Sequence, residues 1–321
     1  MKKIILACMM LVFGLSGSLW AAEPLTIGVA FQQLRDPFFI SIVYGCQKAA
    51  AEEGVRLIVH EAGGYPNVDR QIAQVEDFIQ KKVNMFIIMP CNAKGVAPVV
   101  ERAIGLGIPA MHMGSRVATD KMIAFVQSDD YELGAAQSRY AAKQLGGKGN
   151  LIYIAGPAGV TWTADRWQGY SEEAKKYPGL KILQVHWIDS TREAALRVSE
   201  DSLQAYKDIN SFGAGSDFMI QSAANAVEAA GLKGKILITG AGLLKDTEDM
   251  IRGGLIQMTA AQQTVLIGYT AMKTAVSYLR KQPYKDHTTI PPVIITKENI
   301  DKTSLAWIQH PDSFRPKATY P

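Results

Sequence analysis

The chain alternates short apolar runs with segments in which apolar residues recur at helical spacing. Apolar runs of this length predict buried strands, and the 3.6-residue period predicts amphipathic helices. The expected strands are Leu25–Phe31, Arg56–Glu61, Met85–Met89, Ala110–Met113, Asn150–Ile154, Lys181–Trp187 and Ile236–Thr239. The expected helices are Phe38–Glu53, Asp69–Lys81, Ala93–Leu106, Tyr131–Leu145, Ala164–Tyr177 and Arg192–Tyr206. Continuously apolar strands separated by helices are typical of parallel sheets covered on both faces, so the pattern predicts an α/β fold.

This alternation also predicts where a binding site lies. Parallel strands joined by right-handed crossovers place ligand sites at the carboxyl ends of the strands. The chain is long enough for two ordinary domains, yet no low-complexity linker separates them. We therefore expect two lobes between which the chain passes several times.

The N-terminus has the layout of a secretory signal. Two lysines precede an almost unbroken apolar run, Ile4–Leu15, and small residues follow as far as Ala22. The run is too short to span a bilayer as a mature transmembrane helix. We therefore expect cleavage after Ala21, which removes residues 1–21 and leaves a periplasmic chain that does not insert into the membrane.

Composition narrows the function classes. The chain is 48% hydrophobic and 20% charged, as in a soluble globular protein with substantial cores. Its formal net charge of +4 includes Lys2 and Lys3, which leaves +2 after their removal (4 − 2). So weak a charge, with no lysine or arginine cluster, argues against a nucleic-acid surface.

No motif indicates catalysis, a metal or a cofactor. The sequence has no HExxH or GxSxG motif, and its cysteines and histidines lack zinc spacing. Gly156–Gly159 follows a strand but lacks the Lys-Ser/Thr of a phosphate loop. Cys46 and Cys91 are compatible either with one disulfide or with two buried thiols. We therefore expect a protein that is not an enzyme and that needs no cofactor.

Several motifs are similar to those of a known family. Leu34–Phe39 (LRDPFF), directly after the first expected strand, resembles the type I periplasmic binding proteins, including the ribose-binding group. The same resemblance is carried by Gly45–Ala50, Ser128–Asp130, Gly134, Arg166–Tyr170, Gln262 and Gly268. It implies two Rossmann-like lobes joined by three crossings, which close on a ligand like jaws. The implied first lobe is 24–127 plus 263–291, and the second is 129–261 plus 292–321.

The departures from that family bear on the ligand. Positions where sugar binders carry polar side chains in the cleft are occupied here by Met89, Gly114, Ala164 and Gly242, whereas Asp36, Asp217 and Gln262 persist. A buried site that recognises hydroxyl groups depends on such polar side chains. These four replacements argue against a hexose or pentose ligand.

A second resemblance is narrower. Glu61–Tyr65 (EAGGY), Pro291–Thr296 and Ser313–Pro316 resemble the TorT periplasmic sensor subgroup, as does a tail that runs about 25 residues beyond Thr296. That subgroup detects trimethylamine N-oxide for a partner histidine kinase, with the methylated nitrogen among aromatic faces and near acidic groups. The matching positions here are Asp36, Phe38, Phe39 and Tyr65. The subgroup's tryptophan falls on Asp130 and its late cleft tyrosine falls near Gly242, which favours a different small ligand.

The candidate ligand-binding residues also have structural explanations. Asp36 precedes a proline at a helix start, so it can be the N-cap, a ligand contact or both. Phe38 and Phe39 can be core residues, although their place after the first strand favours a cleft position for at least one. One of Asp129 and Asp130 is explained by N-capping. Trp162 begins a helix of the second lobe, and Arg166 beside it is favoured as a surface charge or a salt bridge. The full candidate set is Asp36, Phe38, Phe39, Tyr65, Met89, Asp129, Asp130, Trp162, Asp217 and Gln262.

These observations predict a periplasmic solute-binding protein with a small, non-sugar ligand in the cleft between the lobes. The TorT-like motifs favour signalling to the periplasmic domain of a sensor histidine kinase. The alternative is the substrate-binding component of an ABC transporter, which would deliver a sugar or another small solute to a permease.

Overall fold

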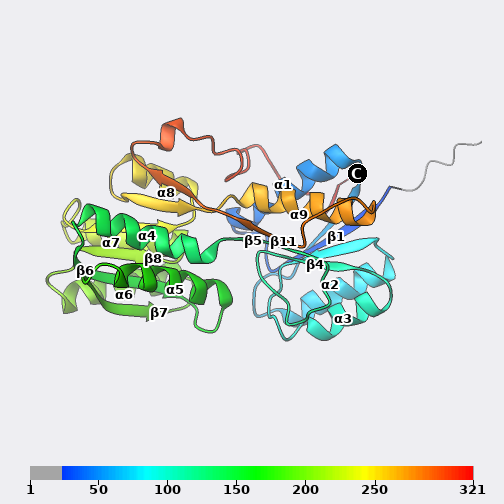
Figure 1. The fold of residues 1–321 in the computed structure, drawn as a ribbon, viewed down its shortest axis with the longest axis horizontal. Coiled ribbons are helices and arrows are strands. Elements are labelled where there is room, and N and C mark those ends of the chain that lie inside the picture. The colour runs from blue at the N-terminus through cyan, green and yellow to red at the C-terminus, as the bar shows by residue number, and fades with distance from the viewer. Residues whose placement is uncertain (1–23, 321) are drawn as a thin grey trace, which may run out of the picture.

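The computed structural model describes residues 24–320, which form two α/β lobes lying side by side (Figure 1). Each lobe has its own sheet, and separate hydrophobic clusters lie on the two faces of each sheet. This confirms the predicted two-lobed α/β fold. None of the helices in this range is long and apolar enough to cross a membrane. The expected signal peptide, residues 1–21, lies outside the described residues.

The first lobe contains a seven-stranded sheet in the order β11-β5-β4-β3-β1-β2-β13. All neighbours are parallel except β13, which is antiparallel to β2. Helices α1 and α9 pack on one face, and α2 and α3 pack on the other. The strands are β1 Thr26–Phe31, β2 Arg56–Glu61, β3 Met85–Ile88, β4 Ala110–Met113, β5 Phe125–Ser128, β11 His287–Ile290 and β13 Thr319–Tyr320. The helices are α1 Pro37–Glu53, α2 Val68–Gln80, α3 Ala97–Gly105 and α9 Thr264–Leu279.

The second lobe contains a six-stranded sheet in the order β12-β10-β9-β8-β6-β7. Its neighbours are parallel except β12, which is antiparallel to β10. The strands are β6 Lys148–Gly156, β7 Gly179–Trp187, β8 Ser211–Ala214, β9 Leu237–Ala241, β10 Met258–Ala261 and β12 Val293–Thr296. The helices are α4 Asp130–Gln144, α5 Thr161–Lys175, α6 Arg192–Ala205, α7 Asp217–Ala229 and α8 Lys245–Arg252, with a short 3-10 helix at Ile300–Lys302.

Some elements were absent from the sequence expectation for a physical reason. Strands β5 (FVQS) and β8 (SFGA) contain polar and small residues, so neither forms the continuous apolar run by which a strand such as β3 is recognised. Helices α7 and α9 are rich in alanine and other buried residues, so neither has a wide polar face. A helix that is buried on most sides loses the amphipathic pattern by which it is recognised.

The chain passes between the lobes at three closely spaced points. The first passage is at Asp129, between β5 and α4, and the second is at Gln262–Gln263, between β10 and α9. The third is at Pro291–Pro292, between β11 and β12. Gln262 Nε2 donates to Ser128 Oγ at 2.9 Å, so a hydrogen bond joins two of the passages. These connections form the hinge about which the lobes are placed.

The C-terminal segment departs from the expected lobe boundary. Residues 292–321 were assigned to the second lobe, and Ile308 does lie in that lobe's core. The chain then returns to the first lobe, where β13 pairs with β2 and Gln47 Nε2 donates to Lys317 O at 3.1 Å. This fourth passage covers the edge of β2, whose backbone groups would otherwise lack partners.

The two cysteines are separate thiols. Cys46 is buried in α1, and its Sγ donates to Gly268 O at 3.4 Å. Cys91 is half-buried just after β3. Of the two alternatives left open by the sequence, the structure therefore has the unlinked pair.

Each lobe contains one pair of helices that touch through glycine. In the second lobe, a Cβ on Gly134 of α4 would lie 1.8 Å from Arg166 O, and one on Gly169 of α5 would lie 1.9 Å from Tyr131 O. In the first lobe, Gly45 and Gly268 bring α1 and α9 together in the same way. At these points the backbones of the two helices are in direct contact. An added methyl group would therefore clash with backbone atoms, which no change of side-chain rotamer can move away.

Gly134→Ala should therefore destabilise the protein by about 3 kcal/mol or more, because overpacking against a backbone cannot be relieved by a rotamer change. The measurement is the free energy of unfolding from denaturant titration. Gly105→Ala is the control, because nothing lies within 4 Å of its added methyl at the end of α3. The control should change stability by less than about 1 kcal/mol. Equal effects of the two variants would contradict the close contact.

Candidate ligand cleft between the two lobes

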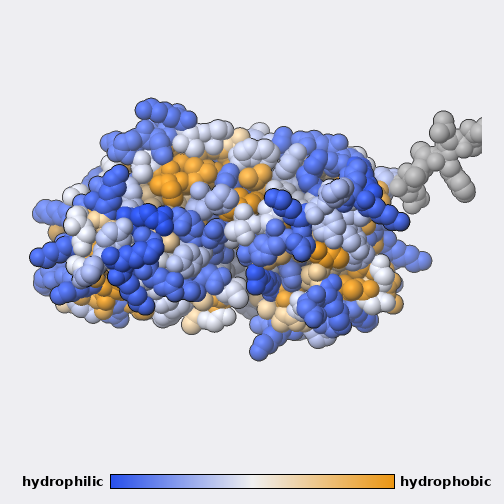
Figure 2. Space-filling view, viewed as in Figure 1, coloured by the Kyte–Doolittle hydropathy of each residue, from blue (hydrophilic) through white to orange (hydrophobic). Residues whose placement is uncertain are grey.

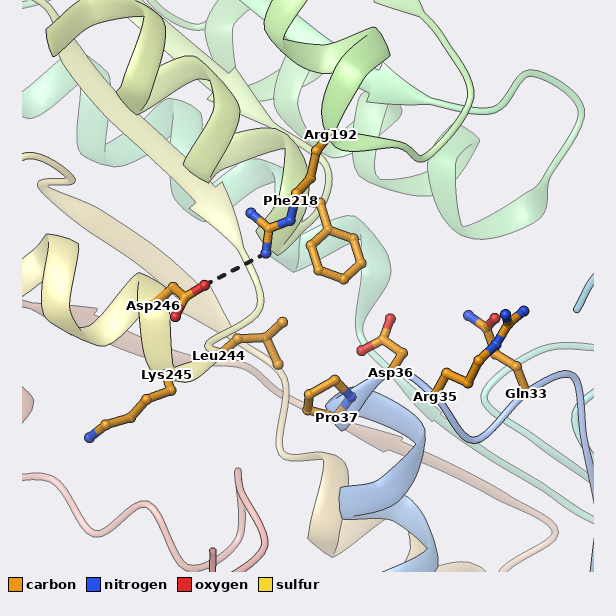
Figure 3. Close-up of a pocket in the computed structure, with 9 residues that line it drawn as sticks. All are labelled: Gln33, Arg35, Asp36, Pro37, Arg192, Phe218, Leu244, Lys245 and Asp246. Atoms are coloured by element: carbon orange, nitrogen blue, oxygen red, sulfur yellow. Dashed lines mark ion pairs between the residues drawn. The ribbon is translucent and has the colours of Figure 1, made fainter. Parts of the chain in front are cut away.

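A cavity of about 520 Å³ lies between the lobes at the carboxyl ends of the strands (Figure 3). The first lobe contributes the loop between β1 and α1, and the second contributes the residues that follow β7, β8 and β9. Figure 2 shows the mostly hydrophilic surface of the two lobes on one face. The residues lining the cavity are Gln33, Arg35, Asp36, Pro37, Arg192, Phe218, Leu244, Lys245 and Asp246.

Asp36 is both a helix cap and a residue of the cavity wall. Its Oδ1 accepts a hydrogen bond from the Phe38 backbone N–H at 2.9 Å, and Pro37 begins the helix. Burial raises the pKa of this carboxyl, while the Phe38 hydrogen bond and the positive charge of Arg192 across the cleft oppose the rise. Asp36 therefore caps α1 and lines the cavity, and its contact with a ligand stays a prediction.

Tyr65 follows the Gly63–Gly64 turn of the first lobe and is not among the residues that line the cavity. Its side chain is 45% exposed, although protein atoms lie densely around its hydroxyl. Burial raises the pKa of its hydroxyl to about 12, and the negative charge of Asp36 adds to this rise. Arg166 of the second lobe acts in the opposite direction, so charges from both lobes reach this hydroxyl.

The second lobe also contains a buried ion pair, whose two members are not among the residues that line the cavity. Arg166, which the sequence favoured as a surface charge or a salt bridge, is 5% exposed. Its Nη2 lies 2.7 Å from Asp130 Oδ1, and its Nη1 donates to Gly215 O. The guanidinium also lies 4.7 Å from the ring centroid of Trp162. These contacts form a cation–π and hydrogen-bonded cluster at the carboxyl end of the sheet.

Asp217 begins α7 directly beyond β8. Its Oδ1 accepts hydrogen bonds from the Leu244 N–H at 2.8 Å and from the Thr247 hydroxyl at 2.7 Å. Burial raises the pKa of this carboxyl to about 7, against the lowering effect of the two hydrogen bonds. The charge of Asp36 raises it further, while Arg166 lowers it. The charges of Asp36 and Arg166 both act on Asp217, which is not itself a lining residue but precedes Phe218 and bonds to Leu244, both of which line the cavity.

Arg192 and Phe218 form the opposite wall from Asp36. The Arg192 guanidinium lies 4.8 Å from the centroid of the Phe218 ring, donates to Gln221 Oε1, and lies 3.7 Å from Asp246 Oδ2. In Figure 3 these side chains face the first lobe's loop across the gap. Of the nine lining residues, the sequence reasoning identified Asp36 and missed the other eight, among them Arg192, Phe218 and Leu244. Phe218 occupies the second position of its helix, as Phe38 does, so recognising β8 and α7 would have pointed to it.

The remaining candidates lie behind the wall or at the hinge. Phe39 and Met89 are 3% and 4% exposed in the first lobe's core, and Phe38 packs edge-on against Phe39. Asp129 caps α4, since its Oδ1 accepts from the Glu132 N–H at 2.9 Å. Gln262 is the buried residue of the hinge hydrogen bond. These five therefore support or connect the walls rather than line the cavity.

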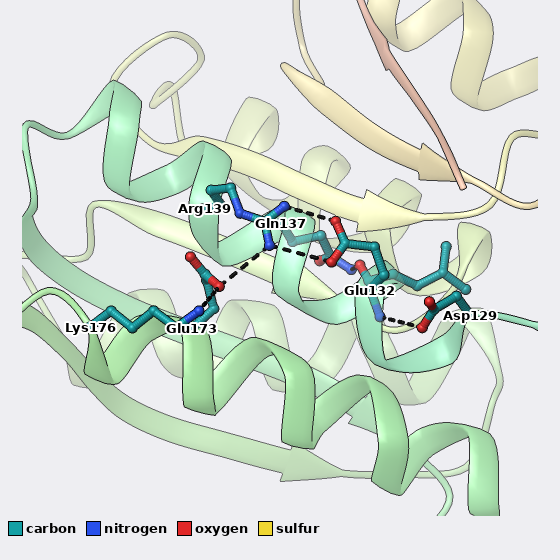
Figure 4. A network of polar contacts seen from close by, with 7 residues as sticks. Asp129, Glu132, Gln137, Arg139, Glu173 and Lys176 are labelled. Atoms are coloured by element: carbon teal, nitrogen blue, oxygen red, sulfur yellow. Dashed lines mark hydrogen bonds and ion pairs between the residues drawn. The ribbon is translucent and has the colours of Figure 1, made fainter. Parts of the chain in front are cut away.

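A second polar network holds α4 and α5 together outside the cavity (Figure 4). Arg139 of α4 pairs with Glu132 at 2.8 Å and with Glu173 of α5 at 3.4 Å, and Glu173 also pairs with Lys176 at 2.8 Å. Within the described range, no group of three or more His, Cys, Asp or Glu side chains is placed to hold a metal ion.

Two lobes with facing polar walls and a shared hinge define a cleft-type binding protein. The chain belongs to the family described as "Periplasmic binding protein domain", whose model matches residues 27–283. The ribose import binding protein RbsB of Bacillus subtilis (strain 168) is 29% identical over 250 residues, which cover 78% of this chain and 80% of that protein.

Two further likenesses bear on function. An ABC transporter periplasmic solute-binding protein from Actinobacillus succinogenes 130z, solved with bound D-allose, is 27% identical with a TM-score of 0.82; the match covers 87% of this chain and all (100%) of that one. Periplasmic protein TorT of Escherichia coli (strain K12) is 23% identical over 296 residues, covering 90% of this chain and 83% of that protein. The comparisons thus give family membership, while the TorT subgroup is not confirmed.

Removing one member of the ion pair should cost more than removing both. Arg166→Met leaves the Asp130 carboxylate buried without its partner, so we expect a loss of about 3–5 kcal/mol in the free energy of unfolding. The double variant Asp130→Asn/Arg166→Met should recover part of that loss, because no uncompensated charge remains. Strictly additive single effects in this double-mutant cycle would show that the two side chains do not interact.

The ionisation of Asp217 predicts a pH-dependent stability. Its pKa rises from 3.8 to about 7 on folding, so the folded protein retains a proton that the unfolded chain releases between those values. Stability is therefore lost as the pH rises through this window. Asp217→Asn cannot ionise and keeps an acceptor for Leu244 and Thr247. Relative to the native protein, it should gain on the order of 1–3 kcal/mol between about pH 4.5 and about pH 8.

The measurement for this prediction is urea unfolding at both pH values. Asp120→Asn, at an exposed position of the first lobe, serves as the control and should show no such gain. A constant difference between Asp217→Asn and the native protein would contradict the burial of this carboxyl.

Proposed function

We propose that this chain is the periplasmic solute-binding component of an ABC importer, and that it holds a small hydrogen-bonding solute of the sugar or polyol class between its lobes. The observation that carries the proposal is the pair of polar walls. Six of the nine residues that line the cavity have charged or amide side chains, and both lobes contribute them. Such groups form hydrogen bonds with hydroxyl groups. When they are buried without a hydrogen-bond partner, the complex loses free energy of binding.

The expectation of a non-sugar ligand rested on four positions that had lost polar side chains. The cavity gains its polar groups from other positions, among them Arg35, Arg192 and Asp246. The aromatic residues expected to receive a methylated nitrogen, Phe38, Phe39 and Tyr65, are not among those that line the cavity, and the Phe218 ring that does line it is covered by Arg192. The relatives named above for ribose import and with bound D-allose support the same solute class.

The mechanism that follows is closure about the hinge. A solute that contacts Asp36 on one lobe and Arg192 on the other stabilises the closed form. The stabilisation comes from the contacts that the solute makes in the closed form and not in the open form. The closed form then presents both lobes to a permease in one fixed arrangement. Export of the chain to the periplasm, with removal of residues 1–21, is part of this proposal.

A sensor role is the second candidate, and the tail favours it. After Ile308 the chain runs across to the first lobe, where His310 Nδ1 lies 2.8 Å from Ser41 Oγ. A tail attached to both lobes moves when the cleft closes, so its outer surface can report ligand binding to a kinase ectodomain. Loss of solute uptake on gene deletion supports the importer, whereas co-purification with a kinase ectodomain supports the sensor.

Asp36→Asn should weaken solute binding by at least about tenfold, because a charged hydrogen-bond acceptor contributes about 1.5–3 kcal/mol. Asparagine retains the helix cap, so the fold should be preserved. The measurement is calorimetric titration with D-ribose, D-allose, xylitol and myo-inositol, together with the decrease in radius of gyration on closure. The control is Asp120→Asn, at an exposed position that is not among the residues lining the cavity. If none of these solutes binds the native protein, the assigned solute class is wrong.

A further inference from the structure

The carboxylate of Asp217 has one satisfied and one free oxygen. Its Oδ1 receives the two hydrogen bonds from Leu244 and Thr247, and no described residue donates to Oδ2. Oδ2 lies 1.9 Å from the place that a Cβ on Gly242 would take, and Gly242 has a φ of +93°. The glycine therefore leaves the space that this oxygen occupies, and any side chain at position 242 would displace it.

Asp36 presents a similar arrangement from the opposite lobe. Its Oδ1 caps α1, and within the described chain it forms no ion pair within 4.0 Å. Figure 3 shows its carboxyl group directed across the cavity toward Phe218 and Leu244. Asp217 adjoins two lining residues, Phe218 and Leu244, on the wall opposite Asp36, and the negative charge of Asp36 raises its pKa.

The cations around the cleft are engaged elsewhere. Arg166 is held by Asp130, by Gly215 O and by the Trp162 ring. Arg192 is held by Gln221, by the Phe218 ring and more loosely by Asp246. The remaining basic side chains of the lining are directed to other partners: Arg35 donates to Gly63 O, and Lys245 lies 3.9 Å from Glu248.

Closure brings these two carboxylates toward each other. Without a bound cation, their repulsion and the loss of solvent both oppose the closed form. A cation bound between the two carboxylates is attracted to both, and these attractions replace the repulsion between them. The cation can contact both carboxylates only in the closed form. A positively charged ligand would therefore stabilise the closed form relative to the open form.

We propose that the solute carries a protonated amine, whose N–H groups donate to Asp36 on the first lobe and to Asp217 Oδ2 on the second, with Gly242 as the residue that makes room for the latter. This rests on the proposed function and specifies its substrate class as an amino polyol or amino sugar. An amine with N–H donors fits better than a quaternary ammonium, because the Phe218 and Trp162 ring faces are already covered by arginine.

The test uses two probes of nearly the same shape, Tris and pentaerythritol, in which an ammonium group replaces a neutral hydroxymethyl group. Each is titrated at millimolar concentration into full-length mature protein that has been freed of endogenous ligand by unfolding and refolding. Melting temperature and isothermal calorimetry are recorded at neutral pH and at fixed ionic strength. We expect Tris to bind at least tenfold more tightly than pentaerythritol.

Variants assign that preference to the two carboxylates. Asp36→Asn keeps the cap and Asp217→Asn keeps its acceptor oxygen, so both should fold, which circular dichroism checks. Each should reduce the preference for Tris to threefold or less, whereas Asp120→Asn should leave it unchanged. Equal binding of the probes to the native protein, binding of neither, or a preference that survives in both variants overturns the proposal. A neutral sugar or polyol that binds and closes the cleft without any amine preference would leave the importer function standing and remove only the amine.

Discussion

The close contact between α4 and α5 is the constraint on which the second lobe's site depends. Gly134 and Gly169 let the two backbones touch, and this fixes the position of Arg166 relative to the first turn of α4. Asp130 lies in that turn, so the ion pair forms inside the lobe rather than on its surface. A buried pair of this kind needs good geometry to offset the desolvation of both charges. The glycines supply that geometry, and the network around Arg139 and Glu173 holds the same helices together on the outer side.

The hydrophobic pattern along the chain predicts the two-lobed architecture, but it does not predict the path of the C-terminal tail. Strands such as Met85–Ile88, buried on both faces, give a strong signal, and so do amphipathic helices such as Val68–Gln80. The return of the tail to the first lobe has no comparable signal. It depends on the backbone edge of β2, which pairs with only two residues, Thr319 and Tyr320. A pairing between segments so distant in the chain leaves no periodic trace in either of them.

The cleft shows why substitutions cannot be interpreted one position at a time. Gly114 and Gly242 were interpreted as positions that had lost polar side chains. In the structure, a side chain from another position occupies the space that a Cβ at each glycine would need. The Met89 Cε lies 2.5 Å from where a Cβ on Gly114 would be, and the Asp217 carboxylate fills the corresponding space at Gly242. Met89 of the first lobe's core thus fills the space beside Gly114, and Asp217, one of the polar residues that persist, fills the space beside Gly242. Sequence identifies the two glycines, but only the fold shows which side chains occupy their space.

The segment Leu243–Thr247, a loop that leads into the first turn of α8, connects the cleft to the tail. Inside the cleft, the Leu244 N–H and the Thr247 hydroxyl both donate to Asp217 Oδ1. On the outer side, Gln309 Nε2 of the tail donates to Leu243 O at 2.7 Å, and the next residue, His310, contacts Ser41 of α1. A ligand that shifts the Asp217 carboxylate therefore acts on a loop that is bonded to the tail, and the tail is bonded to the opposite lobe. These hydrogen bonds form a continuous path from Asp217 through the tail to α1 of the opposite lobe. We therefore expect the position of the tail to change when the cleft closes, whether the protein that recognises the closed form is a permease or a kinase.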